Sequence, residues 1–465
     1  MSLLAAFGVV LAGLGAATGV GWFLTRAWSV ALTRREQFAW ALAVGLLIQA
    51  ACLLVLIVVG FRPSAFRLLL SEAVVAGLAA RGLRGKPSAG GARVRSDRRA
   101  TAVVVILAFV TGMAWLVFVV GAISDSMWST DYLAFWGYKG KVVFLTGEVP
   151  RRLFQDPALY FAHREYPLLV PLSLAALASW LGEWNDQALA VFFPVCALAT
   201  LLAISGFLAR RVSRLSGAAA AALASLCFFL YRPVNAGTAE VPFALSLVLL
   251  VSAALDHTRR DDDSSVWRLA VASIFCAMLK QEGTLFVVLV AGALWLRLRR
   301  GNARAGRLAA AALLLPASTH WVALYLLRGN QTRRDFDFTI FEPARWPELP
   351  PIFASVAGRM LGTEGRQALA AILAIAVYLV VTRPGIGDLL FKVFAVQMFF
   401  YAVAFTVSSF DPMYAIDGAF RRITMSLFPA FSLVLCARLG VPARESGGAL
   451  VSPPVERAGR NSGGG

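Results

Sequence analysis

The residues best suited to chemistry lie in the segment 123–167, where carboxylates, cations and aromatic rings directly follow a long apolar run. Asp125 and Asp131 stand near its beginning, and Lys139 follows within an amphipathic stretch that Gly147 closes. A carboxylate near cations and aromatic rings can act as a general base toward a hydroxyl group. Acidic residues in an exposed loop can equally be solvated without a role, so the spacing alone leaves both interpretations open.

A second set of charged residues stands at the borders of apolar runs further along the chain. Glu240 begins one run, Lys280 and Glu282 separate two others, and Arg421 and Arg422 precede the last. A charge within a membrane costs at least ~2.5–3.5 kcal/mol on insertion scales, so Lys280 needs a partner, a cavity or a ligand. The alternatives are that Lys280 pairs with Glu282 and that the two arginines reach lipid headgroups.

The whole chain has the composition of a membrane protein. Of its 465 residues, 59% are hydrophobic and only 15% are charged, and its mean hydropathy is +0.71. Soluble domains have roughly 45–50% apolar and about 25% charged residues, so a water-facing surface could not hide this much apolar side chain. We therefore expect an all-α fold, a polytopic bundle of transmembrane helices whose partner is the lipid bilayer.

The formal net charge of +18 could indicate a nucleic-acid-binding protein. The basic residues, however, stand in short clusters between apolar runs, which is how positively charged loops fix the orientation of a membrane protein. No basic tract in the sequence alternates with aromatic residues as it would on a soluble domain. We therefore expect no nucleic acid as a partner.

Thirteen apolar runs approach the ~20 residues that a bilayer-spanning helix needs. They are the runs 2–24, 38–60, 65–83, 101–122, 187–209, 217–231, 239–255, 266–280, 284–298, 307–327, 367–382, 388–408 and 422–438. A further run, 166–182, is ambiguous. Five basic clusters can share the cytoplasmic side only if 166–182 does not cross the membrane. These clusters lie at 34–35, 81–99, 210–214, 259–260 and 297–307. We therefore predict 166–182 to be an amphipathic helix along the outer surface.

This topology places Met1 outside, the C-terminal tail inside, and the segments 123–186 and 328–366 on the extracytoplasmic side. It divides the chain into additional N-terminal helices with a basic linker, a core with the two external segments, and a tail. These three parts are 1–100, 101–440 and 441–465. The linker 84–100 and the tail are rich in Gly, Ser, Pro and Arg, a composition typical of disordered segments.

Several familiar signatures of metal and cofactor sites are missing or out of place. The five cysteines all stand in apolar segments without metal-ligand spacing, so neither a zinc site nor a disulfide framework is expected. The run Asp261–Asp263 is similar to an acidic metal-binding motif of nucleotide-sugar transferases, yet it stands in a short basic loop. No Walker or dinucleotide-type Gly-rich loop follows a strand. We expect no cofactor and no metal held by the protein alone, while a divalent metal bound with a substrate stays open.

The order of the features in 123–182 resembles the GT-C glycosyltransferases that use polyprenyl-phosphate sugars, such as protein O-mannosyltransferases and bacterial aminoarabinose transferases. The shared pattern is an Asp in the first external loop, an amphipathic helix, a Gly, and a Pro-containing turn into an interfacial helix. Here the pattern corresponds to Asp131, Gly147 and the turn His163-Arg164-Glu165-Tyr166-Pro167-Leu168. The resemblance covers about 101–438.

Three later segments add to this resemblance. Ala239-Glu240-Val241-Pro242 is similar to an Ala-Asp-x-Pro motif at the outer start of a helix, with Glu in place of Asp. Lys280-Gln281-Glu282-Gly283 is similar to a Lys-x-Glu-Gly turn between two half-buried helices. Arg421 and Arg422, followed by Pro429, resemble the entry to the last span.

The resemblance implies an inverting glycosyltransferase that moves a sugar from a polyprenyl-phosphate donor to an acceptor hydroxyl. The site would face the extracytoplasmic side of a bacterial-type cytoplasmic (inner) membrane. Asp131 would be the general base, with Asp125 as the second choice. The leaving phosphate is anionic and needs arginine or lysine donors. The residues that would bind donor and phosphate are Lys139, His163, Arg164, Tyr166, Glu240, Lys280, Glu282, Arg421 and Arg422. The sugar, the polyprenol and the acceptor stay open.

Two other classes of protein remain as alternatives. A transporter or lipid-linked-sugar flippase would have broken helices in matching positions of two halves and polar groups near the membrane midplane. In this sequence the charges gather at the predicted outer interface instead, and the two halves show no symmetry. A non-catalytic membrane scaffold would have no evident use for the long charged external segments.

Overall fold

The computed structural model describes most of the chain, and every regular element in the described part is a helix. The described residues are 1–26, 32–82, 98–124, 126–127, 129–156, 158–159, 163, 166–230, 237–258, 263–299, 303–328, 342–360, 386–407 and 412–439. The predicted all-α class is therefore confirmed for these residues. Most of the predicted linker 84–100, the predicted span 367–382 and the tail 441–465 lie outside the described residues.

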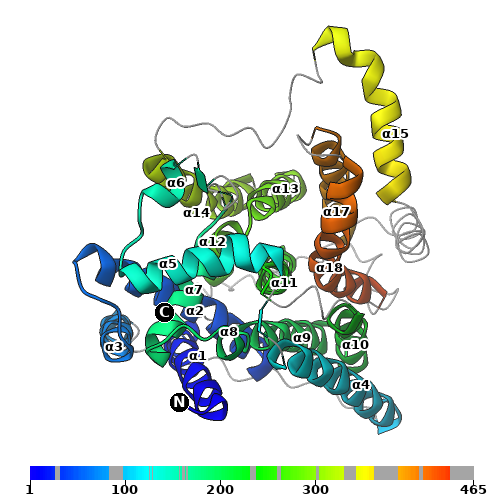
Figure 1. Cartoon of the computed structure of the whole chain (residues 1–465). Coiled ribbons are helices and arrows are strands. Elements are labelled where there is room, and N and C mark those ends of the chain that lie inside the picture. Colours follow the sequence, from blue (N-terminus) through cyan, green and yellow to red (C-terminus); the bar gives the residue numbers. More distant parts are fainter. Residues whose placement is uncertain are drawn as a thin grey trace, which may run out of the picture.

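Figure 1 shows the arrangement of the helices along the chain. They are α1 (Leu3–Thr25), α2 (Arg34–Val58), α3 (Ala65–Gly82), α4 (Arg98–Ile123), the π-helical turn η1 (Tyr132–Trp136), α5 (Gly137–Thr146), α6 (Arg152–Gln155), α7 (Leu169–Leu181), α8 (Asp186–Leu189), α9 (Phe192–Arg211), α10 (Arg214–Leu230), α11 (Glu240–His257), α12 (Asp263–Ala277), α13 (Gln281–Leu298), α14 (Ala303–Arg328), the 3-10 helix η4 (Pro343–Glu348), α15 (Leu349–Met360), α17 (Ile386–Thr406) and α18 (Pro412–Leu439).

Seven helical segments in the described part are long and apolar enough to cross a membrane. They are Leu3–Thr25, Arg34–Val58, Thr101–Ile123, Asp186–Arg211, Glu240–His257, Gln281–Leu298 and Leu389–Thr406. Shorter apolar helices lie at Leu169–Leu181, Arg214–Phe228, Ser265–Ala277 and Met425–Leu439. These helices support a membrane protein, while the larger number of spans stays a prediction.

Helix α11 lies near the middle of the bundle, and nearly all of its side chains are buried (Figure 1). Helices α9, α12 and α18 pack against it. Its buried hydroxyls are satisfied locally, since Ser246 and Ser252 donate to carbonyl oxygens three residues earlier at 2.7 and 2.9 Å. A helix that is apolar on every side and buried on every side is typical of a bundle interior. The two ends of α11 therefore mark the two ends of the molecule.

The peripheral helix α4 has the opposite character. It exposes large apolar side chains along most of its length, among them Val105, Ile106 and Phe109. In water such a surface would favour aggregation, whereas in a bilayer it contacts lipid tails. The contrast between α4 and α11 is the arrangement expected of a helical bundle surrounded by lipid.

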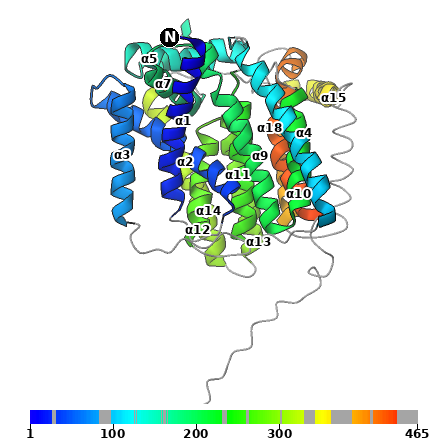
Figure 2. The same cartoon turned by 90° about the horizontal axis from the view of Figure 1, so that it is seen from below.

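Helices α5 and α7 lie together at one end of the bundle (Figure 2). Their close approach depends on Gly140, because a Cβ atom there would lie 2.8 Å from the carbonyl oxygen of Pro171. The prediction that 166–182 is an amphipathic helix on the outer surface is wrong about its exposure. The structure buries α7 continuously from Leu169 to Ser179, between α5 and the helices α1 and α2. Since α5 covers the face that was expected to meet water, the apolar residues can surround the whole helix.

The N-terminal helices pack directly onto the rest of the bundle. Helix α2 contacts α7 and α9, and α1 contacts α2 and α7. Helix α2 begins with a capping box, in which the Thr33 hydroxyl accepts from the Glu36 N–H at 3.2 Å and the Glu36 carboxylate accepts from the Thr33 N–H at 2.9 Å. The region 1–82 thus shares one core with the helices that follow it.

Candidate functional site

The carboxylate of Asp131 forms an ion pair with the guanidinium of Arg422. The two residues are 291 positions apart in the sequence, and they come from the segment after α4 and from α18. Both side chains are 18% exposed. The pair is therefore neither fully solvated nor sealed in the core, which is the condition in which a charged group can still meet a ligand.

The π-helical turn η1 directly after Asp131 is held in place by Tyr132. The Tyr132 hydroxyl donates to Oδ1 of Asp186 at 2.5 Å, and Trp184 Nε1 donates to the same oxygen at 2.7 Å. Burial, together with the hydrogen bond to Asp186, raises the pKa of Tyr132 well above its ordinary value. Tyr132 therefore stays protonated, and it fixes a π turn of the kind often found at functional sites.

The turn between α12 and α13 supplies a second cation. Lys280 Nζ lies 3.1 Å from Glu240 Oε1 and 3.2 Å from Glu282 Oε1, and 5.9 Å from the centre of the Phe243 ring. Gly283 permits this turn, because a Cβ atom there would lie 2.2 Å from the Cys276 carbonyl oxygen. Packing thus accounts for two residues of the Lys-Gln-Glu-Gly sequence. Gly283 allows α12 and α13 to approach each other, and Lys280 forms an ion pair with Glu240, the first residue of α11.

Asp131, Glu240, Lys280, Glu282 and Arg422 form one group, which we call the start cluster because it surrounds the start of α11. Its members interact electrostatically across the ion pairs, since Glu240 acts on both Asp131 and Arg422. Burial raises the pKa of Asp131, the charge of Arg422 opposes this effect, and the negative charge of Glu240 adds to it. With three carboxylates and two ammonium or guanidinium groups, the start cluster is not a closed set of pairs.

The start cluster has an unsatisfied oxygen and an open side. Oε2 of Glu240 is buried without a hydrogen-bond partner among the described residues, and the side chain of Glu282 is 25% exposed. A buried carboxylate oxygen without a donor costs free energy, and because the start cluster is partly exposed a ligand could supply the missing donor. The geometry therefore allows a hydroxyl group or another donor to bind beside Glu240.

A group of aromatic rings lies beside the start cluster. The Tyr166 ring is stacked against Trp136 with ring centres 5.3 Å apart and against His163 at 4.7 Å, and Phe135 meets His163 edge-on at 4.3 Å. Tyr166 also acts electrostatically on Lys280. Aromatic side chains next to carboxylates can pack against the apolar face of a ligand ring while the carboxylates bind its polar groups.

Lys139, predicted to bind the donor or phosphate, lies buried beside the turn at His163. Its ammonium is buried and donates to the carbonyl oxygen of His163 at 2.7 Å. His163 itself has a positive φ of 43°, which is uncommon for a residue with a Cβ atom. Lys139 therefore joins α5 to the turn that carries Tyr166 through a hydrogen bond to the backbone.

The structure brings together six of the eleven residues predicted for the site. Asp131, Glu240, Lys280, Glu282 and Arg422 form the start cluster and Tyr166 lies beside it, whereas Lys139 and His163 hold the adjoining turn. The remaining three lie outside the description: Asp125 and Arg164 fall among residues that the structure does not describe, and so does the side chain of Arg421.

Tyr401 is a member of the site that the sequence did not reveal. It lies on α17, is buried, and interacts electrostatically with Lys280, Glu282 and Glu240. A tyrosine within the apolar run 388–408 looks like an ordinary core residue, so only the fold identifies it. Among the described residues, no three His, Cys, Asp or Glu side chains are grouped so that they could hold a metal ion.

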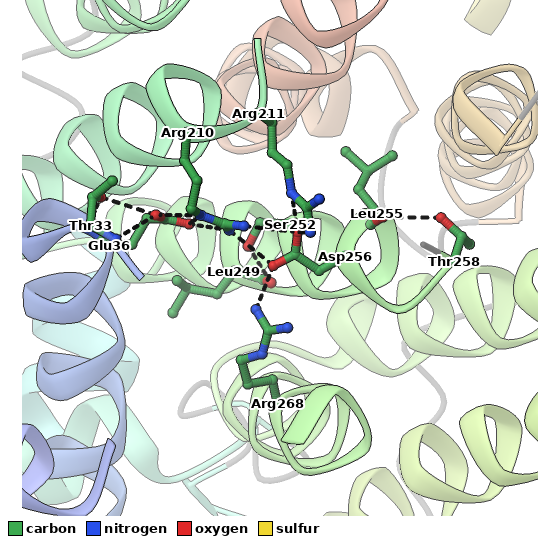
Figure 3. Close-up of polar contacts among 10 residues, drawn as sticks. All are labelled: Thr33, Glu36, Arg210, Arg211, Leu249, Ser252, Leu255, Asp256, Thr258 and Arg268. Carbon is green, nitrogen blue, oxygen red and sulfur yellow. Dashed lines mark hydrogen bonds and ion pairs between the residues drawn. The ribbon is translucent and has the colours of Figure 1, made fainter. Parts of the chain in front are cut away.

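A second group of charges lies at the opposite end of α11 (Figure 3). We call Glu36, Arg210, Arg211, Asp256 and Arg268 the end cluster. Asp256 is fully buried and accepts from all three arginines, from Arg210 Nη2 at 2.9 Å, Arg211 Nε at 2.7 Å and Arg268 Nη1 at 2.6 Å. Glu36 Oε1 accepts from Arg210 Nη2 at 2.6 Å. These contacts tie α2, α9, α11 and α12 together.

Comparison with known proteins gives no further assignment. Neither a family model, nor a curated protein, nor a solved structure matches this chain. The chemistry of the start cluster therefore has to be argued from its own residues.

Proposed function

We propose that the chain is an inverting glycosyltransferase that takes its sugar from a polyprenyl-phosphate donor at the membrane surface. The observation that carries this proposal is the meeting of Asp131 with Arg422 and Lys280 in one partly exposed cluster. A carboxylate for the acceptor and two cations for a phosphate are the groups that such a transfer needs. The resemblance of the motif order to GT-C glycosyltransferases points to the same chemistry.

The proposed reaction is a single displacement. The carboxylate of Asp131 removes the proton from an acceptor hydroxyl, and the oxygen attacks the anomeric carbon of the donor sugar. The bond between that carbon and the phosphate oxygen breaks, and the polyprenyl phosphate leaves with the electron pair. Attack from the face opposite the leaving group inverts the configuration at the anomeric carbon.

The cations of the start cluster fit the leaving group. Arg422 and Lys280 can donate charge-assisted hydrogen bonds to phosphate oxygens, and these bonds strengthen as negative charge develops there. Without a ligand, Arg422 is paired with Asp131. A donor phosphate that attracts Arg422 would weaken this pair, so donor binding would leave Asp131 available to the acceptor.

The start cluster also lies where a lipid-linked substrate could reach it. Asp131 precedes α5, which lies across the same end of the bundle as α7 (Figure 2), and the helices below it are apolar. A polyprenyl chain can remain among these helices while the phosphate and the sugar stand at their ends. The polar reaction would then occur at the membrane–water boundary.

The decisive experiment is the variant Asp131→Asn, which keeps the side-chain shape and removes the base. Membranes containing the protein would be supplied with polyprenyl-phosphate hexoses and pentoses, and release of polyprenyl phosphate would be measured. Loss of a general base costs about 10²–10⁴ in rate, so release should fall by that factor. Binding of the donor lipid should persist, because this substitution leaves both cations in place.

The matched control is Glu148→Gln, which neutralises an exposed carboxylate beyond the other end of α5. This variant should transfer sugar at the wild-type rate. Wild-type transfer by Asp131→Asn would refute the mechanism, and transfer lost only in Asp125→Asn would move the base to Asp125. Donor lipid that crosses the membrane without release of polyprenyl phosphate would favour the flippase alternative.

A further inference from the structure

A groove between α2 and α3 lies apart from the start cluster. It has a volume of about 710 Å³ and is lined almost entirely by apolar side chains. Val55 and Leu56 form its α2 wall, and Phe66, Leu70 and Val74 form its α3 wall. The lining on α2 extends from position 48 to position 56, which corresponds to ~12 Å along a helix that rises 1.5 Å per residue.

The surface of this groove suits hydrocarbon. Val55, Phe66, Leu70 and Val74 are each more than half exposed in the chain by itself. Helix α2 is one of the segments long and apolar enough to cross a membrane, so the groove faces the region that lipid tails occupy. A water-filled groove with these walls would leave a large apolar surface hydrated, which is unfavourable.

The groove is a preformed feature, because another face of α3 is fixed to the bundle. Leu68 and Glu72, one turn apart on that face, are both completely buried. Gln49 Nε2 donates to Glu72 Oε1 at 3.1 Å and to the carbonyl oxygen of Gly13 at 3.4 Å. This polar bridge holds α1, α2 and α3 together inside the bundle, so the groove walls keep their spacing.

Two arginines, Arg62 and Arg67, lie close together near the start of α3. Arg67 lines the groove, donates from Nη1 to the Arg62 carbonyl oxygen at 2.6 Å, and lies over the Phe61 ring at 5.3 Å. Both arginines are exposed. Within the described part of the chain, neither one forms an ion pair with a carboxylate. The groove therefore combines an apolar channel with a positively charged entrance.

We propose that this groove binds one acyl chain of an anionic phospholipid, whose phosphate is held by Arg67 and Arg62. The apolar walls match the chain, and the guanidinium groups match the phosphate in geometry and charge. Arg62 also lies beside the C-cap of α5, since a Cβ atom on Gly147 would lie 3.6 Å from Arg62 Cγ. The bound lipid would thus steady the end of α5 opposite Asp131.

The test measures lipid retention and not sugar transfer, so it stands independently of the proposed function. The purified protein is equilibrated with equal amounts of phosphatidylglycerol and phosphatidylcholine and examined by native mass spectrometry. The wild type should retain phosphatidylglycerol in preference. The double variant Arg62→Gln/Arg67→Gln should retain about tenfold less of it, as expected for loss of charge-assisted contacts.

Two further variants separate the chain from the headgroup. Ala51 is an exposed residue of the groove lining, so Ala51→Phe should fill the groove and reduce retention of phosphatidylglycerol at an unchanged unfolding temperature. The control Arg151→Gln/Arg152→Gln removes two exposed arginines beyond α5 and should retain lipid as the wild type does. Equal retention of both lipids by the wild type, wild-type retention by either groove variant, or an equal loss in the control would overturn the proposal. Displacement of phosphatidylglycerol by added undecaprenyl phosphate would overturn the assignment to a phospholipid.

Discussion

The two ends of α11 carry charge clusters of similar size and opposite character. In the end cluster, the fully buried Asp256 accepts from three arginines at once, and Glu36 accepts from one of them (Figure 3). In the start cluster, three carboxylates share two cations, and one oxygen of Glu240 has no partner in the part of the chain that the structure describes. Arg268 Nε and Nη2 in the end cluster are also buried without a partner among the described residues. The two clusters therefore differ in exposure: the side chains of Asp131 and Arg422 are each 18% exposed, whereas those of Asp256 and Arg268 are 0% and 1% exposed.

The difference in exposure between the two clusters indicates which buried charges stabilise the fold and which can still bind a ligand. Charges taken out of water need matching partners, and a well-matched network fixes the elements that contribute to it. The end cluster meets this description, because Asp256 joins α9, α11 and α12, and Glu36 adds α2. The start cluster keeps partial exposure and an unfilled acceptor, which is the state expected of a binding site before its ligand arrives.

The largest expected effect concerns the end cluster. Asp256→Asn leaves three guanidinium groups facing a neutral amide in a buried place, and breaking a buried ion pair costs about 3–5 kcal/mol. The unfolding temperature and the yield of folded protein should both fall clearly. Thermal unfolding in detergent, followed by tryptophan fluorescence, measures the change.

A matched exposed pair provides the control for this prediction. Arg345 and Glu348 lie 3.1 Å apart, with side chains 35% and 51% exposed. Glu348→Gln should change the stability by about 0–1 kcal/mol, as is usual for surface pairs. If Asp256→Asn unfolds at the same temperature as Glu348→Gln, the end cluster is not a structural clamp.

A smaller effect is expected when the start cluster loses a cation. Arg422→Met should weaken binding of the polyprenyl-phosphate donor about ten- to hundredfold, because a charge-assisted hydrogen bond is worth roughly 1.5–3 kcal/mol. Its unfolding temperature should change less than that of Asp256→Asn. Donor binding to the protein in nanodiscs, compared with the exposed-surface variant Arg151→Met, measures the effect. Donor affinity equal to the wild type would assign Arg422 to structure alone.

The pH dependence of sugar transfer should report the pKa of Asp131, on which burial and the charge of Arg422 have opposite effects. Burial raises the Asp131 pKa, and the charge of Arg422 opposes that rise. The ionised carboxylate is the active base, so kcat/KM should fall as the pH drops through this pKa. Arg422→Met removes the opposing charge and should move the acidic limb to higher pH, whereas Arg422→Lys should leave it near its wild-type position. A limb that moves to lower pH in Arg422→Met contradicts this account.

The least disruptive test asks whether the two clusters face opposite sides of the membrane. Glu183 follows α7 at the start-cluster end and is exposed. A cysteine placed there should react with an impermeant thiol reagent added outside intact cells, while transfer stays at the wild-type level. A cysteine in place of Arg34, at the start of α2, is the control and should react only after the membrane is permeabilised. Protection of position 183 from outside would reverse the predicted orientation.

Much of the start cluster could be predicted because its residues break a local pattern. Asp131, Glu240, Lys280 and Arg422 are charged residues at the borders of apolar runs, and each is conspicuous for that reason. The sequence does not reveal which of these residues form ion pairs with one another. The ion pair between Asp131 and Arg422 joins positions 291 residues apart, and only the fold brings α18 to the residue before η1.

The end cluster shows the limit of the same approach. Arg210 and Arg211 looked like loop charges that orient the chain, since two arginines after an apolar run are common at the cytoplasmic side. The fold turns them inward onto Asp256, the penultimate residue of α11. Helix α7 was misjudged for a related reason: its apolarity is readable in the sequence, but the burial of every face depends on the cover that α5 supplies.

The π-helical turn at Tyr132–Trp136 makes the spacing from Asp131 to Gly147 a constraint in its own right. An α-helix advances by about 100° per residue, so removing one residue from this turn would swing Asp131 around the axis relative to the face that α5 packs on α7. The carboxylate would leave Arg422 although no charged residue had been altered. Exposed positions such as Leu133 can vary in chemical type, but the number of residues cannot. In evolutionary terms, this stretch should tolerate substitution far better than insertion or deletion.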